Sequence, residues 1–279
     1  MSRELSKLNH EVFGFTKDSL NITDHEAVYF TLSKLKPDIL INCAAWTDVN
    51  LAEKLPIEAS LVNSESLKGI TKTCIDLSTK LIHISTDHVF SGTQSKPYAE
   101  DSKRIPVNHY GASKLSGEMI IENFMSTNYW IIRTSWLYGN SNNDFISKVL
   151  RKYRETTADI PVVADHIGHP TLVNDLANKI IEIIDKQPKF GTYHGSNTGT
   201  TSWFNFAQES LRLLGLDANR ITPVKYSELA LSVKRPEHVE LDFSNWSKEG
   251  LSPMRNWSLA LNHCLKEGGL NVKYQTTQD

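Results

Sequence analysis

Short apolar runs alternate along the chain with longer segments of helical period, and this pattern predicts an α/β fold with a mostly parallel sheet. The predicted strands cover residues 11–16, 38–44, 80–85, 130–135 and 160–164. The second, third and fourth of these are almost entirely apolar, as strands covered on both faces require. We therefore expect those three to be the central strands.

The helical period predicts helices at about residues 25–35, 56–77, 110–124 and 144–154. Another helix is predicted to begin near Thr171, because aliphatic residues recur there on one helical face. Its stripe consists of Leu172, Leu176, Ile180, Ile183 and Ile184. Crossovers of these lengths suit right-handed β-α-β units. Roughly the last ninety residues alternate less cleanly, so we expect a smaller second domain there.

Composition narrows the class of protein. The 279 residues are 39% hydrophobic and 22% charged, which is typical of a globular chain with a sizeable core. The 30 Lys and Arg residues against 32 Asp and Glu residues leave a net charge of −2, which argues against nucleic-acid and membrane-surface partners.

The amino terminus and the cysteines indicate a cytoplasmic protein. The first residues are charged and lack the apolar core of a signal peptide, and no segment is apolar enough to span a membrane. The cysteines Cys43, Cys74 and Cys264 are odd in number and far apart, so we expect neither disulfides nor a zinc site.

Tyr110 and Lys114 lie four residues apart near the predicted start of a helix, which places both side chains on one face. An ammonium beside a phenol stabilises the phenolate. We therefore expect Lys114 to lower the pKa of Tyr110, so that Tyr110 exchanges a proton near neutrality. This spacing is common by chance, so its interpretation depends on the surrounding sequence.

Small and oxygen-bearing side chains follow the predicted strands. One strand ends in Ser-Thr-Asp at residues 85–87, and the preceding strand ends in Ala44 and Ala45. A third is followed by Trp136 and Tyr138, aromatic residues suited to stacking on a sugar or base. Ligands bind at the carboxyl ends of strands in open α/β sheets, so these ends predict a binding site.

Several runs resemble the extended short-chain dehydrogenase/reductases and, within them, the dTDP-4-dehydrorhamnose reductases, over nearly the whole chain. They lie at residues 37–45, 83–87, 106–118, 133–136, 167–171, 193–194 and 235–236. Arg-Thr-Ser-Trp at 133–136 and Gly-x-Pro-Thr at 168–171 are more specific to this branch than Tyr-x-x-x-Lys. The resemblance implies a Rossmann-like doubly wound parallel sheet with a smaller α/β substrate domain. Residues 1–135 and about 158–186 would bind the dinucleotide; about 136–157 and 187–279 would bind the sugar nucleotide.

The resemblance also implies a catalytic triad of Thr86, Tyr110 and Lys114. Lys114 would hold the nicotinamide ribose. Tyr110 would donate a proton to the C4 carbonyl oxygen of a nucleotide-linked 4-keto-6-deoxy sugar, and Thr86 would hydrogen-bond that oxygen. The implied substrate contacts are Thr47, Thr86, Asp87 and Trp136; the implied cofactor contacts are Ala44, Ala45, Asn63, Ser85, Tyr110 and Lys114.

The implied reaction is NADPH-dependent reduction of dTDP-4-dehydro-6-deoxy-L-mannose to dTDP-L-rhamnose, for cell-surface or spore-coat polysaccharide. No acid follows residues 11–16 to bind the ribose 2′-hydroxyl, whereas Lys17 could meet a 2′-phosphate. We therefore favour NADPH as the cofactor, with NADH as the alternative. The other interpretation of Lys17 is an ordinary solvated lysine on the surface. The resemblance allows a homodimer and a Mg²⁺ ion at a subunit contact; no residues are spaced as a catalytic metal cluster.

One feature of the family pattern is missing. Dinucleotide-binding folds begin with a strand, a glycine-rich turn and a helix whose amino end holds the pyrophosphate. Here Gly14 is the only glycine before Gly69, so that turn and the first strand have no counterpart. We expect the working protein to carry about 15–20 further amino-terminal residues. The alternative is a true deletion that weakens nucleotide binding, and an intact mass near 31.5 kDa from the native source would favour it.

Other functions remain open at this point. A 4,6-dehydratase typically has an Asp-Glu pair after the threonine, whereas His88 follows Asp87 here. An epimerase could use the same Tyr and Lys. A non-catalytic nucleotide-binding subunit, resembling the regulatory subunit of methionine adenosyltransferase, fits the missing turn but has no chemical need for all three triad residues.

Overall fold

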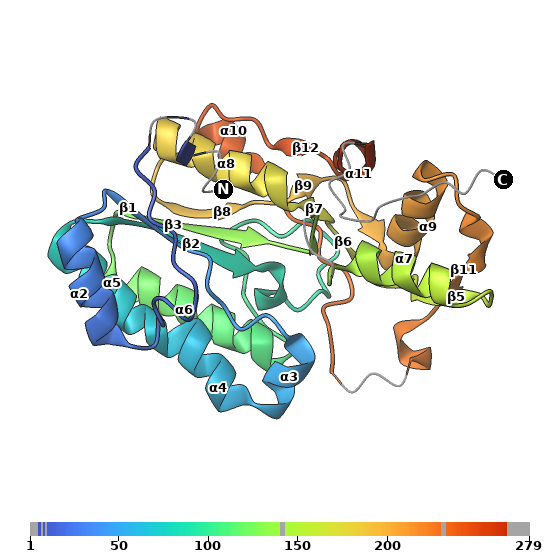
Figure 1. The fold of residues 1–279 in the computed structure, drawn as a ribbon, viewed down its shortest axis with the longest axis horizontal. Helices are drawn as coiled ribbons and strands as arrows, with labels where there is room; N and C mark the ends of the chain where they lie inside the picture. Colours follow the sequence, from blue (N-terminus) through green and yellow to red (C-terminus); the bar gives the residue numbers. More distant parts are fainter. Residues whose placement is uncertain (1–4, 7, 9, 140–142, 230–232, 267–279) are drawn as a thin grey trace. The chain divides into compact units, whose positions relative to one another are not determined.

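The computed structural model describes residues 5–6, 8, 10–139, 143–229 and 233–266 (Figure 1). Two compact units can be distinguished along the chain. The first consists of Met1–Thr134, Asn178–Gly195 and Ser232–Ser252, and the second of Ser135–Ala177, Ser196–Leu231 and Pro253–Asp279. This division differs from the predicted domains chiefly in assigning residues 158–177 to the second unit and residues 187–195 and 232–252 to the first.

The first unit contains a parallel sheet of four strands in the order β1 (Ile39–Asn42), β2 (Lys80–Thr86), β3 (Tyr129–Thr134) and β8 (Gly191–His194). The register pairs Asn42 with His83 across β1 and β2. β2 and β3 are internal and almost wholly buried, as their apolar sequences require. β8 was not predicted.

Helices cover both faces of this sheet, which confirms the predicted fold class (Figure 1). α2 (His25–Leu35), α5 (Ser66–Leu77) and α6 (His109–Phe124) lie on one face. The other face carries α8 (Val173–Lys186) and α10 (Ser244–Lys248). Residues 173–177 of α8 belong to the second unit. The core between the sheet and the first group contains Val28, Leu32, Leu67, Ile70, Cys74, Leu81, Ile121, Met125 and Ile131.

Two of the strand predictions were wrong. Residues 11–16 have no strand partner and form no strand, and Phe13 and Phe15 are 48% and 46% exposed. β1 was expected to be central, but it is an edge strand in the described part of the chain. In both cases the pattern of apolar residues does not specify how many hydrogen-bonding neighbours a segment has: residues 11–16 have none, and β1 has β2 alone among the described strands.

The predicted helix over residues 56–77 is continuous but not uniform. It comprises α4 (Pro56–Ser60), a π-helical turn η1 (Leu61–Glu65) and α5, and it is preceded by the short helix α3 (Val49–Lys54). π-turns are frequent at functional sites. This one carries Asn63, which is 1% exposed.

The second unit is built on short paired strands. β5 (Ile160–Val163) pairs in parallel with β11 (Ile221–Val224), so the fifth predicted strand exists outside the main sheet. The other pairs are β4 (Leu137–Tyr138) with β7 (Thr171–Leu172), β6 (Ile167–Gly168) with β10 (Thr201–Ser202), and β9 (Asn197–Thr198) with β12 (Met254–Asn256).

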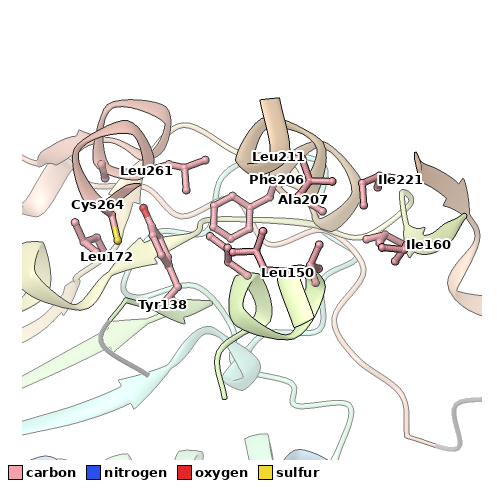
Figure 2. Close-up of a cluster of buried hydrophobic side chains, with 14 residues drawn as sticks. Tyr138, Leu150, Ile160, Leu172, Phe206, Ala207, Leu211, Ile221, Leu261 and Cys264 are labelled. Carbon is pink, nitrogen blue, oxygen red and sulfur yellow. The ribbon is translucent and has the colours of Figure 1, made fainter. Parts of the chain in front are cut away.

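Three helices of the second unit enclose its core: α7 (Phe145–Glu155), α9 (Trp203–Leu213) and α11 (Trp257–Lys266). Figure 2 shows Phe206 of α9 between side chains of α7 and α11, with Tyr138 and Cys264 at one end and Ile160 and Ile221 at the other. The described residues also include the short helices η2 (Asp87–Val89), η3 (Ala218–Arg220) and η4 (Tyr226–Glu228).

Candidate active site

The carboxyl end of β2 and the first turns of α6 bring Thr86, Tyr110 and Lys114 together in the first unit. Thr86 is the last residue of β2, and Tyr110 and Lys114 lie one turn apart on α6. A side-chain hydrogen bond joins Tyr110 to Thr86. The Thr86 hydroxyl donates in turn to Oδ1 of Asp87 at 3.2 Å.

Two features fix the start of α6 beside β2. Asn108 caps the helix, because its Oδ1 accepts a hydrogen bond from the Gly111 N–H at 2.8 Å. Gly111 allows the helix to approach the loop after β2, since a Cβ there would lie only 2.2 Å from the carbonyl oxygen of His88. The residue after Tyr110 must therefore be glycine for the phenol to reach Thr86.

The Lys114 ammonium group is deeply buried, and its side chain is 1% exposed. Its Nζ lies 3.0 Å from Nε2 of His83 and donates to the carbonyl oxygen of Ile84 at 2.7 Å. Burial lowers the pKa of Lys114 to about 8, opposed by the charge of Glu118.

The expectation that Lys114 lowers the pKa of Tyr110 was wrong for this structure. Burial raises the pKa of Tyr110 to about 12, although its hydrogen bond with Thr86 acts in the opposite direction. The Tyr110 phenol therefore keeps its proton near neutral pH. That state suits a proton donor, which is the role predicted for it.

Asp87 and His88 complete the surroundings of the phenol. Asp87 is 4% exposed, and burial raises its pKa to about 7. The His88 ring lies edge-on to Tyr110 with ring centroids 5.4 Å apart, and burial lowers the pKa of His88 to about 4. His88 is therefore neutral near pH 7, and its Nδ1 is 3.1 Å from Nδ2 of Asn108.

The predicted cofactor residues lie in different settings. Ala44 and Ala45 follow β1 in a partly open loop, and the Ala44 N–H donates to Oδ1 of Asn42 at 3.1 Å. Asn63 bonds both backbone groups of Trp46, at 2.8 and 3.0 Å, and so holds that loop against η1. Lys17 is exposed in a turn.

Ser85 points away from the triad hydroxyls, because its Oγ donates to the buried carboxylate of Glu118 at 2.6 Å. Glu118 also accepts two hydrogen bonds from Arg133, at 2.9 and 2.8 Å, and one from Arg104. These partners hold the pKa of Glu118 below its usual range despite burial. This network was not predicted from the sequence, although an arginine within an apolar strand was a visible signal for it.

His83 was also missed as a functional candidate. It is 1% exposed, and it lies between Asn42 and Lys114 with its two ring nitrogens 3.1 and 3.0 Å from them. Its position within an apolar strand was the available signal.

Two of the predicted substrate residues belong to other elements than the triad. Thr47 is exposed in the loop before α3. Trp136 belongs to the second unit, where its ring stacks on Trp203 with centroids 3.6 Å apart. A Cβ at Gly168 would lie 2.7 Å from the Trp136 indole, which explains the glycine in the run at 168–171. That Thr47 and Trp136 contact the substrate stays a prediction.

Two cavities of the first unit, of about 890 and 490 Å³, are lined by residues other than the triad. Among the residues that the structure describes, no three metal-ligating side chains form a group that could hold an ion. Within the same residues, no helix is both long enough and apolar enough to span a membrane.

Comparison with known proteins identifies related chains. Residues 1–269 match the family model described as RmlD substrate binding domain. A dTDP-4-keto-6-deoxy-D-glucose reductase from Streptomyces niveus is 37% identical over 92% of this chain and 88% of its own. The spore coat polysaccharide biosynthesis protein SpsK of Bacillus subtilis is 35% identical over 96% of this chain and 92% of its own.

A solved structure is similar over almost the whole chain. The dTDP-4-dehydrorhamnose reductase of Bacillus anthracis, in complex with NADP, superimposes with a TM-score of 0.90 and 35% identity. The match covers 95% of this chain and 93% of that chain.

Proposed function

The chain belongs to the RmlD substrate binding domain family, and from this premise we propose that it reduces a dTDP-linked 4-keto-6-deoxy sugar with NADPH. The proposed reaction converts dTDP-4-dehydro-6-deoxy-L-mannose into dTDP-L-rhamnose. The reductases to which the chain is similar act on substrates of this class, and one of them is named with NADP. Similarity to SpsK is the basis for proposing spore-coat polysaccharide as a destination of the sugar.

One observation carries the proposal. A protonated, half-buried phenol at Tyr110 is hydrogen-bonded to Thr86 at the carboxyl end of a parallel strand, with the amine of Lys114 one helical turn away. Reduction of a ketone needs a proton donor for the oxygen that becomes an alcohol. Tyr110 is the group in this arrangement that holds a proton near neutral pH and lies partly exposed to receive a substrate.

When bound, NADPH supplies the hydride for the carbonyl carbon. Tyr110 would donate its phenolic proton to the carbonyl oxygen, so that the ketone becomes an alcohol with no charge left on the sugar. Thr86 would hydrogen-bond the same oxygen and favour the negative charge that develops there. In the structure this hydroxyl donates to Oδ1 of Asp87 at 3.2 Å, so its single proton would turn from Asp87 to the carbonyl oxygen when the substrate binds.

The residues present fit the nicotinamide and its ribose. Lys114 has three N–H directions when protonated, and its described partners are only His83 and the Ile84 carbonyl, which leaves one for a ribose hydroxyl. Ala44 and Ala45 give the backbone room for a flat group. For the pyrophosphate half the sequence offers no glycine-rich turn, and Lys17 is the proposed contact for a 2′-phosphate.

The test is a coupled measurement of nucleotide oxidation and sugar product. The protein is mixed with dTDP-4-dehydro-6-deoxy-L-mannose and either NADPH or NADH, and absorbance is followed while the products are separated. We expect dTDP-L-rhamnose, with NADPH preferred. Replacing Lys17 with Met should reduce the preference for NADPH without abolishing turnover, and an unchanged preference would remove Lys17 from the proposed cofactor site.

The second candidate is a non-catalytic nucleotide-binding subunit, because the fold by itself does not require catalysis. That protein would bind the dinucleotide or the sugar nucleotide and leave both unchanged in the same assay. An epimerase would change the sugar without net oxidation of NADPH. The three candidates therefore give three different outcomes.

Other properties carried by the resemblance are proposals of the same kind. We propose a homodimer, which sedimentation would detect, and action in the cytoplasm. A Mg²⁺ ion would need ligands from two copies of the chain, because no group of ligands for it occurs among the described residues of this single chain. Activity that is unchanged by a chelator would remove it.

A further inference from the structure

Asn42, His83 and Lys114 form a buried chain of side chains beside the proposed active site. Asn42 and His83 are register partners on β1 and β2, and Lys114 reaches His83 from α6. The three side chains are 5%, 1% and 1% exposed. Buried polar groups must satisfy one another in such a position, so the direction of each hydrogen bond can be worked out.

The direction begins at Ala44, whose N–H donates to Oδ1 of Asn42 at 3.1 Å. The Asn42 atom facing His83 is therefore the amide nitrogen Nδ2, which can only donate, so Nδ1 of His83 must accept. A neutral imidazole with an accepting Nδ1 carries its proton on Nε2, 3.0 Å from Nζ of Lys114. An N–H directed at Nζ requires a lone pair, and only the uncharged amine of Lys114 has one.

Protonation of Lys114 reverses the donor and acceptor roles in the hydrogen bonds that join Asn42, His83 and Lys114. The ammonium has no lone pair, so Nε2 of His83 must become an acceptor and the imidazole proton must move to Nδ1. Nδ1–H then faces the Asn42 amide, which can accept only if it turns its oxygen toward His83. Turning the amide withdraws the acceptor from the Ala44 N–H.

We propose that His83 is a positioning residue that links the protonation state of Lys114 to the backbone of Ala44 through a change of imidazole tautomer. The inference rests on the proposed function, in which Lys114 and Ala44 border the dinucleotide. With Lys114 uncharged, the Ala44 N–H is hydrogen-bonded to Oδ1 of Asn42. With Lys114 charged, that N–H is released toward the proposed cofactor edge at the same time as the ammonium becomes able to hold a ribose.

The groups around this chain permit the switch near neutral pH. The charged or titratable groups that act on Lys114 are His83, Cys43 after β1, and Glu118 on its own helix. Glu118 is ionised and paired with Arg133 and Arg104, and its charge opposes the lowering of the Lys114 pKa. The pKa of Lys114 is lowered to about 8, and burial together with Lys114 holds the pKa of His83 well below its usual range. The imidazole therefore stays neutral while its proton changes position.

The experiment is nitrogen NMR of the ¹⁵N-histidine-labelled full chain, because the two imidazole tautomers have different nitrogen shifts. The His83 signals are assigned by their loss in the His83→Gln variant. We expect the Nε2–H tautomer above a midpoint near pH 8 and the Nδ1–H tautomer below it, with no imidazolium at about pH 6. One tautomer throughout, or imidazolium formation near pH 6.5, would overturn the proposal.

Two variants sharpen the result. In Asn42→Asp both side-chain atoms facing Ala44 and His83 accept, so the Nδ1–H tautomer should persist at every pH up to about 10. Cys43→Ser is the matched control, and it should keep the tautomer change. If Asn42→Asp behaves like the unmodified protein, the Asn42 amide is not part of the link and the proposal fails.

The measurement needs neither substrate nor turnover. A protein that shows the tautomer change but no reductase activity would retain the linkage and lose the proposed function. The opposite result would retain the function and remove the linkage.

Discussion

Two regions of the first unit were both predicted to be strands and have very different structures. In β2 and β3, which are nearly continuous apolar runs, Ile82 and Ile131 are fully buried. In residues 11–16 the apolar residues Phe13 and Phe15 are separated by Gly14 and are about half exposed. The difference shows that an apolar pattern marks a potential strand, while neighbouring strands and helices decide whether it becomes one.

The polar groups around β2, β3 and α6 also differ from those in the loop after β1. Around β2, β3 and α6, buried charges such as Glu118 have hydrogen-bond partners on several elements. The triad is built on that well-partnered side. The loop after β1, which would meet the dinucleotide, belongs to the edge of the sheet.

The largest predicted effect concerns Tyr110. Tyr110→Phe should lower turnover by a factor on the order of 10²–10⁴, because the proton donor is lost, while the affinity for the sugar nucleotide changes little. Stopped or steady-state turnover and direct binding measure the two quantities. Tyr29→Phe, on the exposed surface of α2, is the matched control and should retain full turnover. Equal turnover in both variants would exclude Tyr110 as the donor.

Breaking the buried ion pair between Arg133 and Glu118 should destabilise the folded protein. Arg133→Met removes two hydrogen bonds from Glu118 and should cost about 3–5 kcal/mol in the free energy of unfolding, measured in urea. Lys68→Met breaks the exposed pair with Glu65 and should cost less than about 0.5 kcal/mol. A loss of less than about 1 kcal/mol in the free energy of unfolding of Arg133→Met would contradict a stabilising role for the partners of Glu118.

Truncating an apolar residue should cost more free energy of unfolding in β3 than in residues 11–16. Ile131→Ala should lower the free energy of unfolding by about 2–4 kcal/mol, because it opens a cavity between the sheet and its helices. Phe15→Ala should change it by no more than about 0.5 kcal/mol, since the ring is 46% exposed. Comparable losses would mean that residues 11–16 are packed in solution.

The smallest effect is expected at Glu100, an exception on the well-partnered side. Its side chain is 9% exposed and its Oε1 has no partner among the described residues. Burial raises its pKa to about 7, above the ordinary value of 4.5, so the folded protein loses stability as pH rises from about 4.5 to 7 and the carboxyl ionises. Glu100→Gln should therefore stabilise the protein by about 1–3 kcal/mol at pH 8 and by almost nothing at pH 4.

The neighbouring, exposed Asp101 provides the control. Asp101→Asn should leave the pH dependence of unfolding unchanged. If Glu100→Gln gave the same stabilisation at both pH values, ionisation of Glu100 would not be its cause.

Much of the site and the main sheet could be predicted because both depend on local patterns. β2, β3 and α6 follow from apolar runs and helical period, and Tyr110 with Lys114 follows from their spacing. The contacts of His83 with Lys114, and of Ser85 and Arg133 with Glu118, join residues far apart in sequence. A polar residue within an apolar strand marks His83 and Arg133 as unusual, but it does not identify their partners. β4, β6, β7, β9 and β10 have two residues each, too few for a period to appear.

The most direct test of the proposed reaction follows the hydrogen atom itself. NADPH carrying deuterium at the transferring position of the nicotinamide is incubated with the protein and dTDP-4-dehydro-6-deoxy-L-mannose, and the sugar product is examined by mass spectrometry and NMR. We predict dTDP-L-rhamnose with one deuterium at C4, and loss of that product in Tyr110→Phe. Recovery of the keto sugar unchanged, or of an epimer without deuterium, would contradict the assignment of this chain as a reductase.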